Sequence, residues 1–552
     1  MKSKVVNSIR QTAVVGYAAR LPGAPSSDDV WKVLLDGKCS ISDIPSERWS
    51  TERFYDPDQR VVGKTYSKRA GLLENVYDFD GGYFGLTPRE AEQVDPQQRL
   101  MLETVARAFG HAGLNPSDLD RDRTGVFVGA STLDHSTTGI QDLSLIDAQY
   151  MLGNTLSLIS NRIAYHWDLR GPSYTVDTAC SSGLFALDHA RRAIESGQVD
   201  TAIVGSVNML LSPIPFVGFS KASMLSEKGL CQAFGSDGDG YVRAEGAVAF
   251  VLQCESVARV SQNRIRSYLC ATATNSDGRT PGLAMPSADS QEILLEKVKE
   301  EFGIDPEDLA YVEAHGTGTA VGDPLEARAI GRAFGQARAT PLPIGSAKTN
   351  FGHLEPVSGL VGLLKAQLVL ENGEIPASLH STELNPDIPF EELGIEVVQK
   401  ATAIAEREAP WLVGVNSFGF GGANAHAILR QAKTKDAPEA SKMPDALRIS
   451  AEDDAALHIL AKTWRSKALA ASGKAANADL ARQVSDANLR IARHRHRLLV
   501  VAKTPEGLAA SLGDWLEDGS GKSAVAGVAQ QDKAKIGFVF SGNGAQWPGM
   551  GR

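Results

Sequence analysis

Helix-like and strand-like segments alternate along the second half of this chain. A helical run at Gln291–Phe302 precedes an apolar strand at Leu309–Glu313, and a helix at Pro324–Phe334 precedes a strand at Pro343–Ser346. Strands that are joined by helices run parallel and are buried on both faces of a sheet. The alternation therefore predicts an α/β protein. A similar pattern begins at Ser173, which points to two similar halves but does not demonstrate a duplication.

Cys180 lies where a predicted strand gives way to a predicted helix. The β-prone run Tyr174–Val176 precedes it, and helical periodicity extends from Leu184 to Gly197. The positive end of a helix lowers the pKa of a nearby thiol, and its free N–H groups can hold a developing oxyanion. We therefore expect a reactive thiolate. Position alone leaves open the commoner role of an isolated cysteine, a small buried hydrophobe.

Two histidines follow predicted strands directly. His315 comes after Leu309–Glu313, and His353 comes after Pro343–Ser346. Open α/β sheets place their functional sites at the carboxyl ends of strands. Either histidine alone is equally compatible with a packing role, but together with Cys180 they favour catalysis.

Composition excludes several other classes of function. The net charge is −10 and no arginine-rich or lysine-rich block offsets it, so we expect no nucleic-acid partner. The five cysteines contain no C-x-x-C pair, which predicts reduced thiols in the cytoplasm and no metal site. The glycine-rich segments GSDGDG and GTGTAVGD lack dinucleotide-binding spacing, and neither a phosphate-binding loop nor a G-x-S-x-G motif occurs.

Membrane association is also not expected. The first residues include no apolar core of signal-peptide length. The most apolar helical segment, Gly359–Leu370, is too short to span a bilayer and contains Lys365. We predict a cytoplasmic protein without a membrane partner.

The character of the chain changes near Gln431. The segment KTKDAPEASKMPDA is polar and rich in Pro and Ala, which is typical of a domain boundary. Two helical runs and an apolar strand, Leu498–Val501, lie within Leu447–Ala502 and predict a small α/β unit. A further strand is expected at Ile536–Phe540.

Six motifs together resemble a known family. They are DPQQR at Asp95–Arg99, VDTACSSG around Cys180, GYVRAEGA at Gly240–Ala247, EAHGTGT around His315, KTNFGH at Lys348–His353 and NSFGFGGANAH at Asn416–His426. The stretch Gln11–Leu429 resembles the β-ketoacyl synthase domain of type I polyketide synthases. Lys433–Lys535 is similar to the linker that joins ketosynthase to acyltransferase, and GFVFSGNGAQWPGMG is similar to the start of an acyltransferase.

The resemblance implies an architecture and partners. It predicts a thiolase-like five-layer αβαβα fold made of two similar halves at 1–430, a small α/β linker domain at 431–535, and the start of a truncated acyltransferase domain at 536–552. It also implies a homodimer, a fragment of a longer polypeptide, and an acyl carrier protein as partner. No tightly bound cofactor is expected, because the substrates travel on phosphopantetheine.

The same resemblance implies residue roles in a decarboxylative Claisen condensation. Cys180 would hold the acyl chain, and its own N–H together with that of Phe420 would form an oxyanion hole. His315 and His353 would stabilise the malonyl enolate, and Lys348 would lie behind them, orient His353 and bias the local electric field. The hydroxyl groups that would hold the pantetheine arm belong to Thr317 and Thr319.

The sequence leaves two other functions open. The protein could be a ketosynthase-like decarboxylase or acyl shuttle that does not condense, which the intact Cys180, His315 and His353 disfavour. It could also be a non-catalytic scaffold for carrier proteins, because Arg490, Arg493, Arg495 and Arg497 form a basic cluster that suits an acidic partner. We interpret the intervening His494 and His496 as a solvated face.

Overall fold

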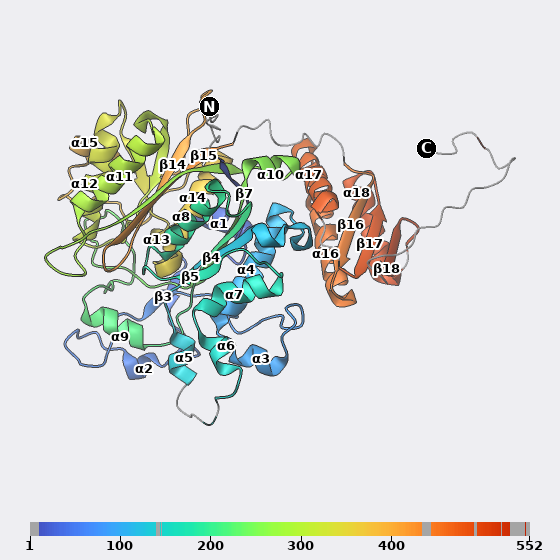
Figure 1. Cartoon of the computed structure of the whole chain (residues 1–552), viewed down its shortest axis with the longest axis horizontal. Coiled ribbons are helices and arrows are strands. Elements are labelled where there is room, and N and C mark those ends of the chain that lie inside the picture. Colours follow the sequence, from blue (N-terminus) through green and yellow to red (C-terminus); the bar gives the residue numbers. More distant parts are fainter. Residues whose placement is uncertain are drawn as a thin grey trace, which may run out of the picture. The chain divides into compact units, whose positions relative to one another are not determined.

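The computed structural model divides the chain into two compact units, Met1–Pro438 and Glu439–Arg552. It describes residues 10–139, 144, 146–432, 443–490, 494–519, 521–529 and 547. The two units are described separately below (Figure 1).

The first unit contains two sets of strands with the same pairing pattern. The first set is β1 (Thr12–Arg20), β4 (Thr124–Gly129), β5 (Ser173–Val176), β6 (Thr201–Asn208) and β7 (Gly246–Cys254). The second set is β8 (Ser267–Ser276), β9 (Leu309–Glu313), β10 (Leu342–Gly345), β14 (Leu412–Phe418) and β15 (Ala423–Gln431), with β12 (Ile395–Val397) added at its edge.

The order of the first set is β5-β4-β6-β7-β1, and that of the second is β10-β9-β14-β15-β8. In each set the first three strands are parallel and the last two pairings are antiparallel. A short antiparallel contact between β1 and β8 joins the two sets into one 11-stranded sheet. The unit is therefore built from two halves with the same strand order and the same pattern of parallel and antiparallel pairing.

Helices cover both faces of each half and produce five layers (Figure 1). The outer helices are α4 (Pro96–Ala112) and α7 (Ser157–His166) on the first half, and α11 (Ala288–Phe302) and α12 (Gly322–Ala333) on the second. The middle layer consists of α8 (Ser182–Glu195) and α14 (Ser358–Asn372). Three buried clusters fill the spaces between the layers, and the central cluster joins these two helices to inward-facing residues of both halves. The expected thiolase-like αβαβα fold is thus observed.

The two middle helices approach each other closely. A Cβ atom at Gly359 would lie 2.6 Å from the Cγ atom of Leu184 on α8, and one at Gly183 would lie 3.0 Å from the Cγ atom of Leu360 on α14. The first distance is shorter than real Cβ contacts allow, and the second is tighter than most of them, so glycine at these two positions allows the helices to approach this closely. The matching contacts also reflect the similarity of the two halves.

The first unit also contains shorter helices and strands. They are α1 (Ser27–Leu35), β2 (Ile41–Asp43), α2 (Thr51–Phe54), β3 (Arg69–Gly71), α3 (Pro88–Gln93), α5 (Asp134–Gly139), α6 (Tyr150–Asn154), α9 (Ile214–Lys221), α10 (Glu255–Val260), α13 (Lys348–Phe351), β11 (Glu374–Ile375), α15 (Phe390–Leu393) and β13 (Thr402–Ala403). Within the described residues, no helix is both long and apolar enough to cross a membrane.

In the described residues of the second unit, a three-stranded antiparallel sheet is accompanied by three helices. Its strands are β16 (Ala446–Ala451), β17 (His496–Val501) and β18 (Ala524–Val528), and its helices are α16 (Asp454–Ala470), α17 (Lys474–Arg490) and α18 (Pro505–Asp518). The sequence predicted only two helices and one strand here. The short strands β16 and β18 were missed because their identity as strands depends on pairing with β17.

Parts of the predicted second unit lie outside the described residues. They are the strand expected at Ile536–Phe540, the side chain of Arg490 and all of Arg493. Of the predicted basic cluster, Arg495 and Arg497 are exposed. His494 is 3.0 Å from Glu452.

The close packing of α8 and α14 predicts how single alanine substitutions change stability. Gly359→Ala should lower the free energy of unfolding of the first unit by about 1–3 kcal/mol, because the methyl group has no room against Leu184. Gly110→Ala is the matched control, since nothing lies within 4 Å of a Cβ atom there, and it should stabilise helix α4 by about 0.5–1 kcal/mol. Urea unfolding midpoints measure both effects, and equal midpoints for the two variants would contradict the packing argument.

Candidate active site

A cavity of about 720 Å³ opens where the carboxyl ends of the parallel strands from both halves meet. The loop after β5 contributes Cys180, and the loop after β9 contributes His315, Thr317 and Thr319. His353 and the loop that follows β14 complete the wall. The two histidines and the cysteine, which are far apart in the sequence, therefore face one cavity.

A strained turn presents Cys180 to this cavity. Ala179, just before it, has a positive φ of 54°, which costs an L-residue roughly 1–2 kcal/mol. Side chains hold the turn: the N–H of Thr178 donates to Ser182 Oγ at 2.9 Å, and the N–H of Ala179 donates to Asp177 Oδ1 at 2.9 Å. The turn thereby fixes the direction of the thiol before helix α8 begins.

The second half anchors the same turn from the opposite side. The carbonyl oxygen of Cys180 accepts hydrogen bonds from Ser417 Oγ at 2.8 Å and from Ser358 Oγ at 3.2 Å. These hydroxyl groups belong to β14 and α14. The position of the thiol is therefore set jointly by both halves.

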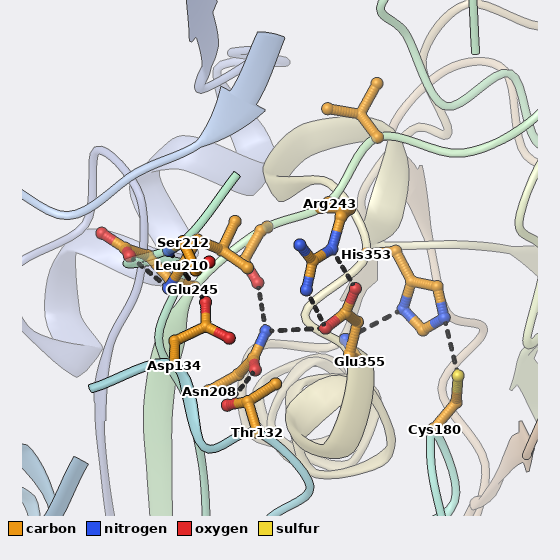
Figure 2. A network of polar contacts seen from close by, with 12 residues as sticks. Thr132, Asp134, Cys180, Asn208, Leu210, Ser212, Arg243, Glu245, His353 and Glu355 are labelled. Atoms are coloured by element: carbon orange, nitrogen blue, oxygen red, sulfur yellow. Dashed lines mark hydrogen bonds and ion pairs between the residues drawn. The ribbon is translucent and has the colours of Figure 1, made fainter. Parts of the chain in front are cut away.

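The tautomer of His353 follows from its hydrogen bonds. Its Nδ1 atom accepts from the backbone N–H of Glu355 at 3.1 Å, and its Nε2 atom lies 3.2 Å from the sulfur of Cys180 (Figure 2). A backbone N–H can only donate, so Nδ1 is unprotonated and Nε2 carries the proton of the neutral ring. His353 thus directs an N–H donor toward the thiol and is not arranged to remove its proton.

His315 has the same arrangement. The backbone N–H of Phe418 donates to its Nδ1 atom at 3.4 Å, so its Nε2 atom also carries the proton of the neutral ring. The ring centroids of His315 and His353 lie 5.4 Å apart with nearly perpendicular planes. Two N–H donors are therefore held side by side in the cavity that contains the thiol.

Burial controls the protonation of both histidines. It lowers the pKa of His315 well below its usual value, and the charge of Lys348 and the neighbouring His353 lower it further. Burial, followed by the charges of Lys348 and Arg243, acts on the pKa of His353 in the same direction. Both rings are consequently neutral near pH 7.

The thiol differs from the sequence-based expectation. Burial raises the pKa of Cys180 to about 11, and the Glu355 carboxylate adds to this rise. The N–H groups of Phe420 and Cys180 and the charge of Lys348 act in the opposite direction, but they are weaker. Our prediction of a lowered pKa was wrong, because the helix N-terminus does not compensate for desolvation. The free protein holds a thiol.

Lys348 makes a hydrogen bond that the sequence did not predict. Its buried ammonium donates to the backbone carbonyl of His315, so it secures the loop that carries His315. His353 is oriented by the N–H of Glu355 and by the ring of Tyr241, whose centroid lies 5.0 Å away.

The remaining predicted residues lie at the cavity wall. The hydroxyl groups of Thr317 and Thr319 are 3.2 Å apart, which presents two polar groups side by side. The Phe420 side chain is 49% exposed, and its ring centroid lies 6.2 Å from that of Phe219. The N–H groups of Cys180 and Phe420 both lower the pKa of the Cys180 thiol.

Sequence reasoning missed the buried residues that support these loops. Glu326 on α12 accepts from the N–H of His315 at 2.6 Å and from that of Gly316 at 2.8 Å. Behind His353, Arg243 donates to both oxygens of Glu355, and Asn208 donates to the same carboxylate at 3.3 Å (Figure 2). The GYVRAEGA motif contains Arg243, but Glu355 is 112 residues away along the chain, so no local pattern indicates the pairing.

The described residues contain no group of three or more His, Cys, Asp or Glu side chains that could hold a metal ion.

Family models match most of the chain. The model for the N-terminal domain of β-ketoacyl synthase matches residues 10–258, that for its C-terminal domain matches 267–382, and that for the ketoacyl-synthetase C-terminal extension matches 385–501.

Solved structures agree with this match. A ketosynthase domain of oxazolomycin biosynthesis from Streptomyces albus superposes with a TM-score of 0.87 at 33% identity, covering 95% of this chain and 91% of that one. The module 6 ketosynthase of the Bacillus subtilis bacillaene synthase gives a TM-score of 0.84 at 31% identity, covering 94% and 87%.

Curated relatives are polyketide synthases. A mycocerosic acid synthase-like polyketide synthase of Mycolicibacterium smegmatis is 38% identical over 99% of this chain, and erythronolide synthase EryA2 of Saccharopolyspora erythraea is 37% identical over 98%. The chain spans 26% of the length of the mycobacterial relative and 15% of EryA2.

The chain belongs to the β-ketoacyl synthase family. Within this family it is a ketosynthase of the type found in type I polyketide synthases.

The raised pKa of Cys180 predicts its pH-dependent alkylation. A thiolate is the reacting species, so the rate with iodoacetamide should rise about tenfold per pH unit from pH 7 until it levels off near the pKa of about 11. Mass spectrometry of the Cys180 peptide measures this rate. The urea-unfolded chain is the control, and its rate should level off near pH 8.5, about the value of a free thiol. A plateau at about pH 8.5 or below in the folded protein would contradict the burial argument.

Proposed function

We propose that this chain catalyses the decarboxylative condensation of a Cys180-bound acyl chain with a malonyl-type thioester on an acyl carrier protein. The observation that carries the proposal is the placement of two Nε2–H donors, from His315 and His353, in one cavity with the sulfur of Cys180. This arrangement supplies an acyl acceptor and a means of stabilising a carbanion. Family membership supports the same reaction.

The first step would transfer the acyl chain. The sulfur of Cys180 attacks the thioester carbonyl of the incoming acyl group, its proton passes to the departing pantetheine sulfur, and a Cys180 thioester forms. The tetrahedral intermediate places negative charge on the former carbonyl oxygen. The N–H groups of Cys180 and Phe420 are the proposed donors to that oxygen.

The second step would generate the nucleophile. The malonyl carboxylate leaves as carbon dioxide, and its bonding electrons move into an enolate whose oxygen accepts from His315 Nε2–H and His353 Nε2–H. Neutral rings suit this role because each donates a hydrogen bond through its Nε2–H group without giving up the proton. The positive charge of Lys348 behind the loop of His315 further favours a negative oxygen.

The third step would form the carbon–carbon bond. The enolate carbon attacks the Cys180 thioester carbonyl, and collapse of the intermediate releases a β-keto thioester on the carrier and the thiolate of Cys180. The thiolate then takes a proton from water. The raised pKa of this residue favours that return to the resting thiol.

The expected partners and domain organisation complete the proposal. Thr317 and Thr319 would bind the pantetheine arm, and the substrate carrier would be an acyl carrier protein. We assign 1–430 to the ketosynthase, 431–535 to a linker and 536–552 to the start of an acyltransferase domain, with a homodimer as the working state. Exposed Arg495 and Arg497 are candidates for contact with an acidic carrier.

Removal of the thiol tests the acyl-holding role. Cys180→Ala should abolish labelling of the protein by a radiolabelled acyl thioester, because no other group is assigned to hold the chain. Cys231→Ala is the control, since this cysteine is buried and outside the cavity lining, and its labelling should equal that of the unaltered chain. Stoichiometric labelling of folded Cys180→Ala would contradict the proposal.

Removal of one histidine tests the enolate donors. His353→Ala and His315→Ala should each slow condensation by about a hundredfold to a thousandfold, as loss of one oxyanion donor typically does. Mass spectrometry of carrier-bound products measures the rate, with His458→Ala in the second unit as the control. A protein that loads acyl groups but forms no product extended by two carbons would instead be an acyl shuttle.

A further inference from the structure

A buried acidic residue that the reaction does not use lies directly beneath the proposed site. Glu313 is the last residue of β9 and is 2% exposed. His315 follows it by two residues. Buried carboxylates are costly unless they are paired and hydrogen-bonded, so its surroundings indicate what it does.

Each oxygen of Glu313 has its own set of partners. Oε1 accepts from the backbone N–H of Ala347 at 2.6 Å. Oε2 accepts from Tyr311 Oη at 2.6 Å and pairs with the ammonium of Lys365 at 2.9 Å. Lys365 lies on α14 and is 1% exposed. The carboxylate is thus fully bound inside the core.

Two hydrogen bonds tie the loops after β9 and β10 together. Glu313 binds Ala347, and the next residue, Lys348, binds the carbonyl of His315. The two strands are already paired in parallel at this height, with Gly345 opposite Glu313. The carboxylate and the ammonium therefore link the segment that carries His315 to the segment that carries Lys348.

Helix α14 leaves room for this carboxylate. A Cβ atom at Gly362 would lie 3.0 Å from the Cγ atom of Glu313 and 3.0 Å from Val415. A methyl group there would be in tight contact with both side chains, so glycine at this position leaves space for Glu313.

We propose that Glu313 is a positioning residue that holds the charged side chain of Lys348 in contact with the His315 loop, so that the enolate oxygen forms opposite a positive charge. This inference rests on the proposed condensation. The ammonium of Lys365 pairs with the carboxylate of Glu313. This ion pair offsets the cost of burying the negative charge.

The charges around Lys348 support this role. Burial lowers the pKa of Lys348, and the carboxylate of Glu313 is the strongest influence that raises it, followed by that of Glu326. The other groups that face Lys348 are Cys180 and Cys231, which raise its pKa when ionised, and the neutral rings of His315 and His353. Removing the Glu313 charge should therefore lower the pKa of Lys348.

The test is the pH dependence of carbon dioxide release from a malonyl pantetheine thioester. Activity that needs protonated Lys348 is lost as pH rises through the pKa of that residue. Glu313→Gln should move this alkaline loss to lower pH by about 1–3 units, the usual effect of one nearby charge. Acylation of Cys180 should stay within about threefold of the unaltered chain, because that step forms no malonyl enolate.

Two further variants separate charge from structure. Lys365→Met removes the positive charge that neutralises Glu313 and should move the alkaline loss to higher pH, opposite to Glu313→Gln. Tyr311→Phe removes a hydrogen bond to Glu313 without changing any charge and should leave the pH of the loss unchanged. If Glu313→Gln does not fold, the upward shift in Lys365→Met decides the question.

The outcomes are distinguishable. An alkaline loss at the same pH in Glu313→Gln, or in Lys365→Met where Glu313→Gln does not fold, would overturn the positioning role while the proposed function stands. If the unaltered chain neither releases carbon dioxide nor extends the acyl chain, the proposed function itself fails and the inference falls with it.

Discussion

The close packing of helix α8 against helix α14 is the contact on which the rest of the molecule depends. Gly183 faces Leu360 and Gly359 faces Leu184, and the two glycines let the backbones approach. Cys180 lies in the turn before α8, and His353 lies shortly before α14. The 3.2 Å distance between the thiol and the imidazole is therefore set by core packing, which holds a reacting group more precisely than a mobile loop does.

Buried charge is the second feature that shapes the site. Four charged side chains lie within the core, and each has a hydrogen-bonding or ion-pair partner. They are Glu313, Glu326, Lys348 and Lys365. Together with desolvation, the positive charge of Lys348 keeps the histidines neutral. In the proposed mechanism the neutral histidines donate hydrogen bonds, so negative charge develops only on the reacting oxygen. Such preorganised donors are most effective where water is excluded.

Much of the fold could be predicted from the sequence. Strand–helix alternation indicated parallel strands, and the positions of His315 and His353 after two such strands placed them at one edge. The pattern around Cys180 correctly predicted a strand, a turn and a helix. These features depend on local periodicity, which is visible along a single chain.

The features that could not be predicted depend on contacts between residues that are far apart in the sequence. The raised pKa of Cys180 follows from burial by both halves, and the pairing of Arg243 with Glu355 joins segments 112 residues apart. Lys348 was expected to orient His353, and its hydrogen bond to the backbone of His315 was not predicted. The edge strands of the second unit were missed for the same reason, since only their partners make them strands.

In the proposed mechanism, two neutral imidazoles donate to one enolate oxygen beside Cys180. The most direct measurement is a crystal structure of the chain with a non-reactive malonyl pantetheine analogue in which methylene replaces the thioester sulfur. We expect the carbonyl oxygen next to the methylene to lie within hydrogen-bonding distance of both His315 Nε2 and His353 Nε2. An oxygen bound instead to the N–H groups of Cys180 and Phe420, with neither histidine in contact, would contradict the mechanism.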